Sequence, residues 1–133
     1  MLKKSIICVA MVIVTLSGFS QKRGRHVKNV ILMVGDGMGV AQIYAGLTGN
    51  YGSLNLERCT AVGFHKNQAS DKYVTDSAAG ATALSCGQKT YNGAIGVDAS
   101  GKPLPTILEA AEKNGLATGM IATCSITHAT PAS

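Results

Sequence analysis

The sequence has no Trp, and aromatic residues make up 5% of its 133 residues. Stacking on aromatic side chains is a main way in which proteins hold single-stranded nucleic acid, so this composition predicts no nucleic-acid partner. No long charged or Pro-rich tract is present, which argues against wholesale disorder. Gly, in contrast, is abundant, with 16 residues against an average share of about 7%. This excess indicates tight turns and close backbone approaches, which suit anion-binding loops.

Cysteine is also scarce, and its spacing excludes the usual cysteine motifs. Of the four Cys, Cys8 lies in the apolar N-terminal run, and Cys59, Cys86 and Cys124 are spread along the rest of the chain. No C-x-x-C pair occurs, so neither a zinc knuckle nor a redox motif is indicated. One disulfide among the last three is compatible with the sequence, which does not say which pair would form. Each thiol can equally be a small buried apolar residue.

The N-terminus has the pattern of a secretory signal peptide. Lys3 and Lys4 precede an apolar run over residues 5–16, and Gly18 and Ser20 stand at the −3 and −1 positions of a cleavage site. The run is shorter than the roughly 20 apolar residues that a membrane-spanning helix needs. An uncleaved anchor is the alternative to a cleaved signal. We therefore expect export to the periplasm or the extracellular space, with no stable membrane anchor after cleavage.

Three segments follow from this interpretation: a signal peptide over residues 1–20, a basic leader over 21–26, and a folded portion over 27–133. Cleavage would remove two Lys and no acidic residue, so the formal net charge would fall from +5 to +3. The remaining basic residues cluster near the new N-terminus. Such a cluster is more often a solvated leader than a nucleic-acid patch.

The folded portion alternates between apolar runs and helix-like segments. Residues 29–34 and 118–124 are apolar runs typical of strands buried on both faces, and residues 59–64 are a weaker strand candidate. Helices are expected over 40–47, over 78–85 with Gly87 after it, and from a Thr106 N-cap to Asn114 with Gly115 after it. This order predicts an α/β protein with a largely parallel sheet.

Ligands of such sheets bind at the carboxyl ends of the strands, so we examined the polar residues there. Asp36 lies between two glycines directly after the first expected strand, where its carboxylate could approach a cation. Ser77 follows Asp76 at the expected start of a helix, where the helix dipole favours phosphate oxygens. Taken alone, Asp36 is as well explained by a turn, and Asp76 or Ser77 by a helix N-cap.

A third polar group, His128 and Thr130, follows the last expected strand. The two side chains could both point into a cleft if the segment is extended, although a lone His there is more often an ordinary surface residue. No Gly-x-Ser-x-Gly elbow is present, so a Ser–His–acid triad is poorly supported. Activation of Ser77 by a metal ion fits better, because a cation lowers the pKa of a coordinated hydroxyl.

Taken together, these segments resemble the amino-terminal part of the alkaline phosphatases. The resemblance is carried by KNVILMVGDGMG, YVTDSAAGATA, KTYNGAIGVD, PTILEAAEKNGLATG and THATPAS, which span most of residues 27–133 in the order of the family. The V-x-D-S stretch with its small residues and Thr, at positions 74–82, is the active-site signature of the family. The resemblance implies a three-layer α/β/α alkaline-phosphatase-like fold with a largely parallel central sheet, present as its N-terminal part.

The resemblance also implies a role for each site residue. Ser77 is similar to the nucleophile that forms a phosphoserine intermediate and is a metal ligand, and Asp36 to the carboxylate that bridges one zinc and the magnesium. Thr130 matches a hydroxyl ligand at the magnesium site. His128 departs from the bacterial enzymes that carry Asp there and agrees with His-bearing, animal-like variants, which puts the identity of the third metal in question. Asp76 resembles the aspartate beside the nucleophile and has a supporting role.

The implied function is hydrolysis of phosphate monoesters with two Zn²⁺ and one Mg²⁺, in a homodimer when the protein is full-length. Other zinc ligands, a phosphate-binding Arg and a Glu for magnesium are expected from later in the family's sequence, so residues 1–133 are expected to be inactive alone. Two alternatives remain open. One is a related metallohydrolase that acts on phosphodiesters or sulfates, and the other is a non-catalytic anion- or metal-binding fragment.

Overall fold

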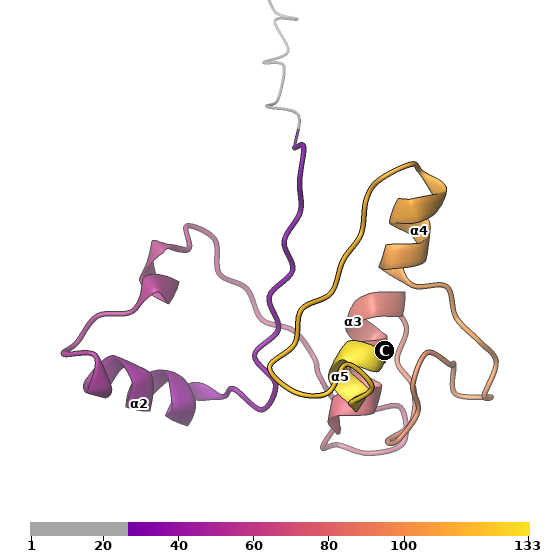
Figure 1. Cartoon of the computed structure of the whole chain (residues 1–133). Helices are drawn as coiled ribbons and strands as arrows, with labels where there is room; N and C mark the ends of the chain where they lie inside the picture. Colours follow the sequence, from indigo (N-terminus) through magenta and orange to yellow (C-terminus); the bar gives the residue numbers. More distant parts are fainter. Residues whose placement is uncertain (1–26) are drawn as a thin grey trace, which may run out of the picture. The chain divides into compact units, whose positions relative to one another are not determined.

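The computed structural model describes residues 27–133, so the expected signal peptide and basic leader lie outside the described residues. The chain divides after Met33, and the larger part runs from Val34 to Ser133. Its elements are α2 (Val40–Gly49), the 3₁₀-helix η1 (Asn55–Arg58), α3 (Ser77–Cys86), α4 (Ile107–Lys113) and α5 (Ala129–Ala132). Figure 1 shows these elements joined by long connections.

The helix α3 is the best-buried element of the described chain, and its sequence explains why. Small residues on one side of it, Ala78, Ala79, Ala81 and Thr82, are buried. The helix ends at Gly87, which has a φ of 71° and donates its amide to the carbonyl of Ala83. That left-handed conformation is accessible to Gly without a steric penalty, so the sequence correctly predicted the end of this helix.

The ends of α4 also follow from local sequence. The Thr106 hydroxyl accepts a hydrogen bond from the amide of Glu109 at 3.2 Å, and the Glu109 carboxylate accepts one from the amide of Thr106 at 2.9 Å. This reciprocal pair is the predicted capping box. The helix stops before its C-cap Asn114, and Gly115 follows with a φ of 74°.

The core around α3 is small. The buried apolar residues of the described chain are all alanines, at positions 69, 78, 79, 81 and 94. Thr82 is fully buried among them, and its hydroxyl donates to the carbonyl of Ala94 at 3.2 Å and accepts from the amide of Gly96 at 3.0 Å. One side chain thus fastens the loop at residues 94–96 to α3.

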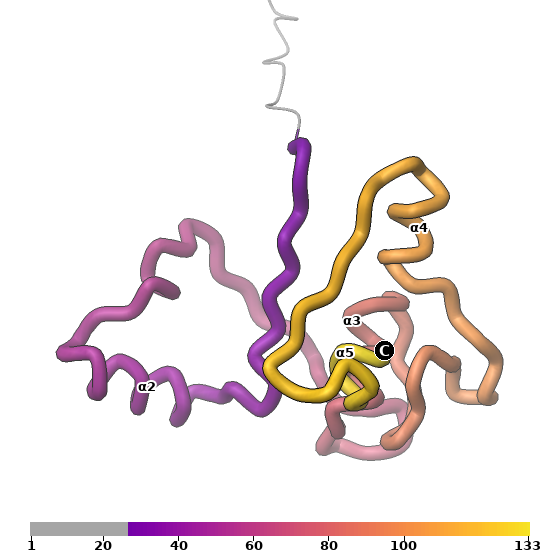
Figure 2. Tube along the Cα trace, viewed as in Figure 1, coloured from indigo at the N-terminus to yellow at the C-terminus, as the bar shows by residue number. Residues whose placement is uncertain are grey.

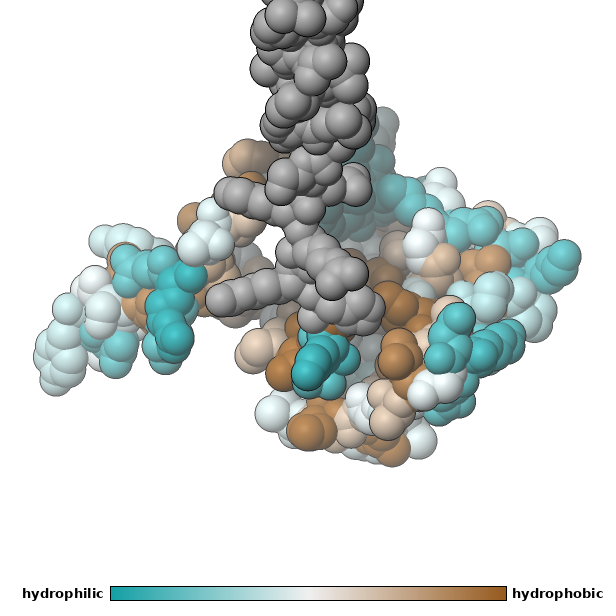
Figure 3. Space-filling model, turned by 90° about the horizontal axis from the view of Figure 1, so that it is seen from above, coloured by the Kyte–Doolittle hydropathy of each residue, from teal (hydrophilic) through white to brown (hydrophobic). Residues whose placement is uncertain are grey.

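The expected strands differ from what the structure shows. Residues 29–34, 59–64 and 118–124 form no strand, and the described residues contain only an isolated antiparallel bridge between Val97 and Pro103. A strand buried on both faces needs strands beside it and helices over it. Here the apolar side chains lack that cover: Ile31 is 85% exposed and Ile121 101% exposed. Hydrophobic residues are accordingly visible on the surface in Figure 3.

Two further findings concern the cysteines and membrane crossing. Cys59, Cys86 and Cys124 are free thiols, so the pairing left open by the sequence is not formed among them. No helix within residues 27–133 combines the length and apolar character that a membrane span requires.

Candidate functional site

Asp36 is presented by a tight turn at residues 35–38. The amide of Met38 donates to the carbonyl of Gly35 at 3.1 Å, and Gly37 has a φ of 64°. A Cβ atom on Gly35 would lie 2.7 Å from the Met38 side chain, so a larger residue would force the turn apart. The glycines on both sides therefore have a structural purpose, which is to hold Asp36 at the tip of a turn. Its carboxylate is exposed there.

Ser77 is the first residue of α3. Asp76 before it is the N-cap, with extended backbone (φ −104°, ψ 179°), and its Oδ1 accepts a hydrogen bond from the amide of Ala79 at 2.8 Å. This arrangement places the half-buried Ser77 hydroxyl at the N-terminal, positive end of a ten-residue helix.

The Asp36 carboxylate brings three predicted site residues together. The Ser77 hydroxyl lies 3.2 Å from both carboxylate oxygens of Asp36, and the Thr130 hydroxyl donates to Oδ2 at 3.0 Å. These residues are 41 and 94 positions from Asp36 in the sequence. The result is a cluster of carboxylate and hydroxyl oxygens, which are hard donors of the kind that bind small divalent cations.

Thr130 reaches the cluster because α5 packs against α3. Figures 1 and 2 show the two helices side by side, although 42 residues separate the end of one from the start of the other. The Ser133 hydroxyl adds a bond of 3.5 Å to the carbonyl of Ala78, and the Ser85 hydroxyl donates to the carbonyl of Ser133 at 2.6 Å. The packing of α5 thereby supplies the third oxygen donor.

His128 is not part of the cluster in this structure. It is the N-cap residue of α5, its side chain makes no capping hydrogen bond, and it is exposed. The helix α5 begins at Ala129 and completes one turn, and Thr130 is its second residue. Within residues 27–133 no three His, Cys, Asp or Glu side chains lie together in a metal-binding group.

Asp76 uses both carboxylate oxygens for backbone contacts. While Oδ1 caps α3, Oδ2 accepts the amide of Gly93 at 2.6 Å. A carboxylate tied in this way holds the start of the helix in place and is not directed at the Ser77 hydroxyl. The supporting role that the resemblance implies for Asp76 stays a prediction.

Asn92, a residue that no sequence motif singled out, contacts the segment before Ser77. Its Oδ1 accepts the amide of Asp76 at 3.0 Å, and its Nδ2 donates to the carbonyl of Val74 at 3.0 Å. The Asn-Gly dipeptide at 92–93 was a signal of a turn, yet no local pattern connects that turn with a helix 16 residues earlier.

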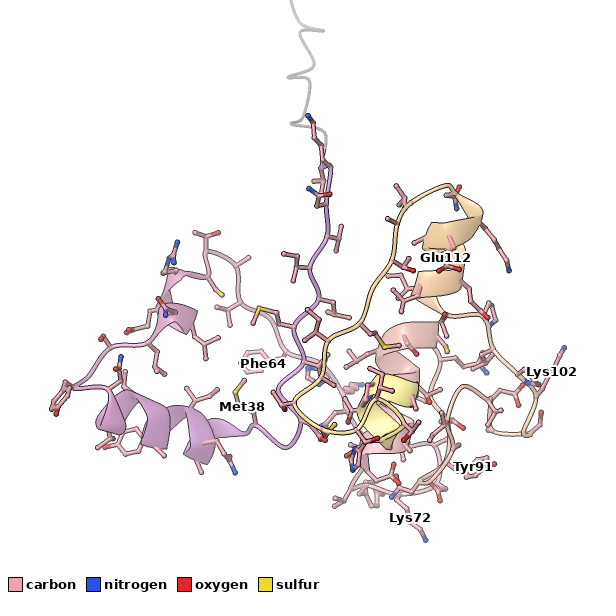
Figure 4. All side chains as sticks on the ribbon, in the orientation of Figure 1. Met38, Phe64, Lys72, Tyr91, Lys102 and Glu112 are labelled. Carbon is pink, nitrogen blue, oxygen red and sulfur yellow. The ribbon has the colours of Figure 1, made fainter. Side chains whose placement is uncertain are left out.

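One carboxyl outside the cluster is electrostatically perturbed. The hydroxyl of Ser100 donates to Asp98 at 2.6 Å and lowers the pKa of that carboxyl below its usual value, and the amide of Lys102 lowers it further. Asp98 thereby closes the exposed turn between the bridged residues Val97 and Pro103. The side chains of Lys102 and Lys72 extend away from the ribbon in Figure 4.

Known proteins provide an independent comparison. The alkaline phosphatase family matches residues 27–133. Alkaline phosphatase from Escherichia coli is 47% identical over 115 residues, which cover 79% of this chain and 24% of that protein. Repressible alkaline phosphatase from Saccharomyces cerevisiae is 40% identical over 142 residues, which cover 97% of this chain and 25% of the yeast protein. The chain thus spans about a quarter of the length of these curated relatives.

A solved structure extends the match to the fold. Alkaline phosphatase from the Antarctic bacterium TAB5 superposes with a TM-score of 0.75 at 48% identity, over 77% of this chain and 30% of that one. A variant of the TAB5 enzyme in which aspartate replaces a histidine carries Mg in its M3 site. The described residues therefore have an alkaline-phosphatase-like fold over the matched segment.

Proposed function

Since the chain belongs to the alkaline phosphatase family, we propose that it supplies the nucleophile for hydrolysis of phosphate monoesters, and that this nucleophile is Ser77. The observation that carries the proposal is the contact of the Ser77 hydroxyl with both oxygens of Asp36, at the N-terminus of α3. A nucleophile in this position faces the positive end of the helix dipole, which favours the charged phosphoryl group.

The reaction that these residues support has two steps. The Ser77 Oγ forms a bond to phosphorus as the bond between phosphorus and the substrate oxygen breaks, and the proton released by the Ser77 hydroxyl to water is balanced by the one that the departing oxygen takes up from water to leave as the alcohol. Water then cleaves the phosphoserine, releases inorganic phosphate and restores the hydroxyl. Phosphoryl transfer depends mainly on positioning and on neutralising charge, so a rigid Ser77 at a helix N-terminus is a suitable acceptor.

The oxygen cluster fits a divalent cation. Asp36, Ser77 and Thr130 would hold it, because the hydroxyl oxygens of Ser77 and Thr130 already lie next to the Asp36 carboxylate, and all three groups can be metal ligands. When bound, such a cation lowers the pKa of a coordinated hydroxyl and offsets the negative charge of the phosphoryl group. We propose the family complement of two Zn²⁺ and one Mg²⁺, with His128 beside the third site and the remaining ligands supplied by segments other than residues 27–133.

The same proposal covers the organisation of the whole protein. Residues 1–20 are a signal peptide for export, and residues 27–133 are the first portion of a larger three-layer α/β/α domain that acts as a homodimer. The exposed apolar segments at 29–34 and 118–124 support this arrangement, because they have the composition of buried strands and would gain their cover from the rest of the sheet.

The proposal is tested by turnover of a chromogenic phosphate monoester. The 133-residue chain alone should give none, because no three His, Cys, Asp or Glu side chains lie together within residues 27–133 and the oxygen cluster there contains a single carboxylate. The complete domain, obtained by reading the coding sequence past Ser133, should hydrolyse the ester and lose activity with a chelator. Ser77→Ala should abolish that activity, whereas Ser53→Ala, at an exposed serine after α2, should retain it. Chelator-sensitive turnover by Ser77→Ala would contradict the proposal.

A further inference from the structure

We propose that Asn92 is a positioning residue that holds the segment leading into Ser77 in its reactive place; this inference rests on the role proposed above for Ser77. Asn92 does not contact Ser77 or Asp36 itself. It acts through residues 74–76, which run directly into α3.

Asn92 binds this stretch through both polar atoms of its side chain. Its Oδ1 accepts the amide of Asp76 at 3.0 Å while its Nδ2 donates to the carbonyl of Val74 at 3.0 Å. A carboxamide presents an acceptor oxygen and an N–H donor on the same side, so one Asn side chain satisfies the amide of Asp76 and the carbonyl of Val74 at once, on a segment that has no strand beside it. The half-buried side chain thus fixes both the position and the direction of the backbone one residue before Ser77.

A second tether comes from the neighbouring residue. The amide of Gly93 donates to Oδ2 of Asp76 at 2.6 Å, and the other oxygen of Asp76 caps α3. Hydrogen bonds to an ionised carboxylate are stronger than those between neutral groups. Residues 92 and 93 therefore hold Asp76 by its backbone and by its side chain together.

The turn that carries Asn92 is itself fixed. The amide of Ala94 donates to the carbonyl of Tyr91 at 3.1 Å, and Gly93 has a φ of 88°, as the third position of such a turn requires. The amide of Asn92 also donates to Oδ1 of Asp71 at 3.1 Å. Because this turn is held by hydrogen bonds of its own, the Asn92 side chain has a fixed position and can restrain residues 74–76.

The consequence for the reaction is a loss of orientation when Asn92 is truncated. The amide of Asp76 and the carbonyl of Val74 lose their partner, and the 91–94 turn then holds Asp76 through the Gly93 amide alone. A displacement of about 1 Å in a reacting group can cost about 10²-fold in rate. We expect Asn92→Ala to lower the rate of Ser77 phosphorylation by about 10- to 100-fold, with KM changed less than about twofold.

The experiment uses the complete, metal-loaded protein and a matched control. Asn114 provides that control, because its Nδ2 donates to the carbonyl of Ala110 at 2.8 Å, so Asn114→Ala also removes an Asn side chain bonded to backbone, but in α4. Single-turnover phosphorylation, KM and thermal unfolding are measured for both variants and for Asn92→Asp, which keeps the Oδ1 acceptor. The expected order of phosphorylation rates is Asn114→Ala, then Asn92→Asp, then Asn92→Ala, with similar unfolding temperatures.

Two results would overturn the inference. One is a phosphorylation rate for folded Asn92→Ala within twofold of that for Asn114→Ala. The other is measured on the wild-type protein. The amide of Asp76 is expected to be protected from hydrogen exchange by its bond to Asn92 Oδ1. Exchange at the rate of a free amide would show that this hydrogen bond is not formed. Ser77→Ala separates the two proposals. An inactive Ser77→Ala beside an unaffected Asn92→Ala contradicts the positioning role alone, whereas an active Ser77→Ala contradicts the nucleophile and the positioning role with it.

Discussion

The Asp76 carboxylate accepts backbone hydrogen bonds from two sides, and replacing Asp76 by alanine removes both. One bond, from the amide of Ala79, caps α3; the other, from the amide of Gly93, joins the helix to the 91–94 turn. We predict that Asp76→Ala destabilises the region around α3 far more than the loss of an ordinary N-cap.

The magnitude follows from the surroundings of each donor. Loss of an N-cap side chain costs about 1 kcal/mol, and the upper half of the range of about 0.5–2 kcal/mol applies because Ala79 is buried and its amide is left without the carboxylate. Gly93 is exposed, so water replaces much of the second bond, and its loss adds about 1 kcal/mol. The total is about 2–3 kcal/mol.

Thr106 serves as the matched control. It caps α4 through one bond to Glu109, and no residue of α4 is buried, so Thr106→Ala should cost about 0.5–1 kcal/mol. Asp76→Asn keeps a capping oxygen and should lose less than Asp76→Ala. Urea unfolding followed by circular dichroism, with amide exchange for α3 and α4 separately, measures these differences. Equal losses for Asp76→Ala and Thr106→Ala would refute the reasoning.

Three further predictions concern other parts of the chain. Replacing the buried Thr82 by Val leaves the 94–96 loop without two hydrogen bonds and should cost about 2–3 kcal/mol in urea unfolding, while Thr82→Ser should cost less. The Ser100 hydroxyl lowers the pKa of Asp98, so the turn that Asp98 closes should stay intact above the usual carboxyl pKa of 3.8 and open as the pH falls through the lowered pKa. An NMR titration of Asp98 should have its midpoint below 3.8, and Ser100→Ala should raise that midpoint. In the complete protein, His128→Asp should increase bound Mg²⁺ relative to Zn²⁺ in elemental analysis, because carboxylate oxygen suits the harder ion.

The helices could be predicted from the sequence because their limits are set by nearby residues. The caps Asp76 and Thr106 and the positive-φ glycines Gly87 and Gly115 act within a few positions of the backbone groups that they satisfy. The expected helix over 40–47 is likewise present as α2, which extends to Gly49.

The strands failed for a physical reason. An apolar run such as residues 29–34 has a strong tendency to be buried, but it becomes a strand only through hydrogen bonds to another strand. Those partners are not encoded in the run itself, and residues 27–133 provide none of them. The composition of the run therefore indicates that it tends to be buried, but the prediction that it forms a strand was wrong for residues 27–133.

The candidate site was predictable in part. Asp36, Ser77 and Thr130 were singled out from their motifs, and the structure places the hydroxyls of Ser77 and Thr130 within 3.2 Å of the Asp36 carboxylate oxygens. His128 was assigned to the same set; it is the exposed N-cap residue of α5, and its role as a metal ligand stays a prediction. The contact of Asn92 could not be predicted, because an Asn-Gly pair indicates a turn but not the segment that the turn contacts.

The central claim is that Ser77 accepts the phosphoryl group, and the most direct test is to locate that group. The complete protein is mixed with a phosphate monoester, quenched in acid, digested and analysed by mass spectrometry. A phosphate on Ser77, lost in Ser77→Ala and retained in Ser53→Ala, is the predicted result. Phosphate trapped on another residue, or at an unchanged level in Ser77→Ala, would contradict the account.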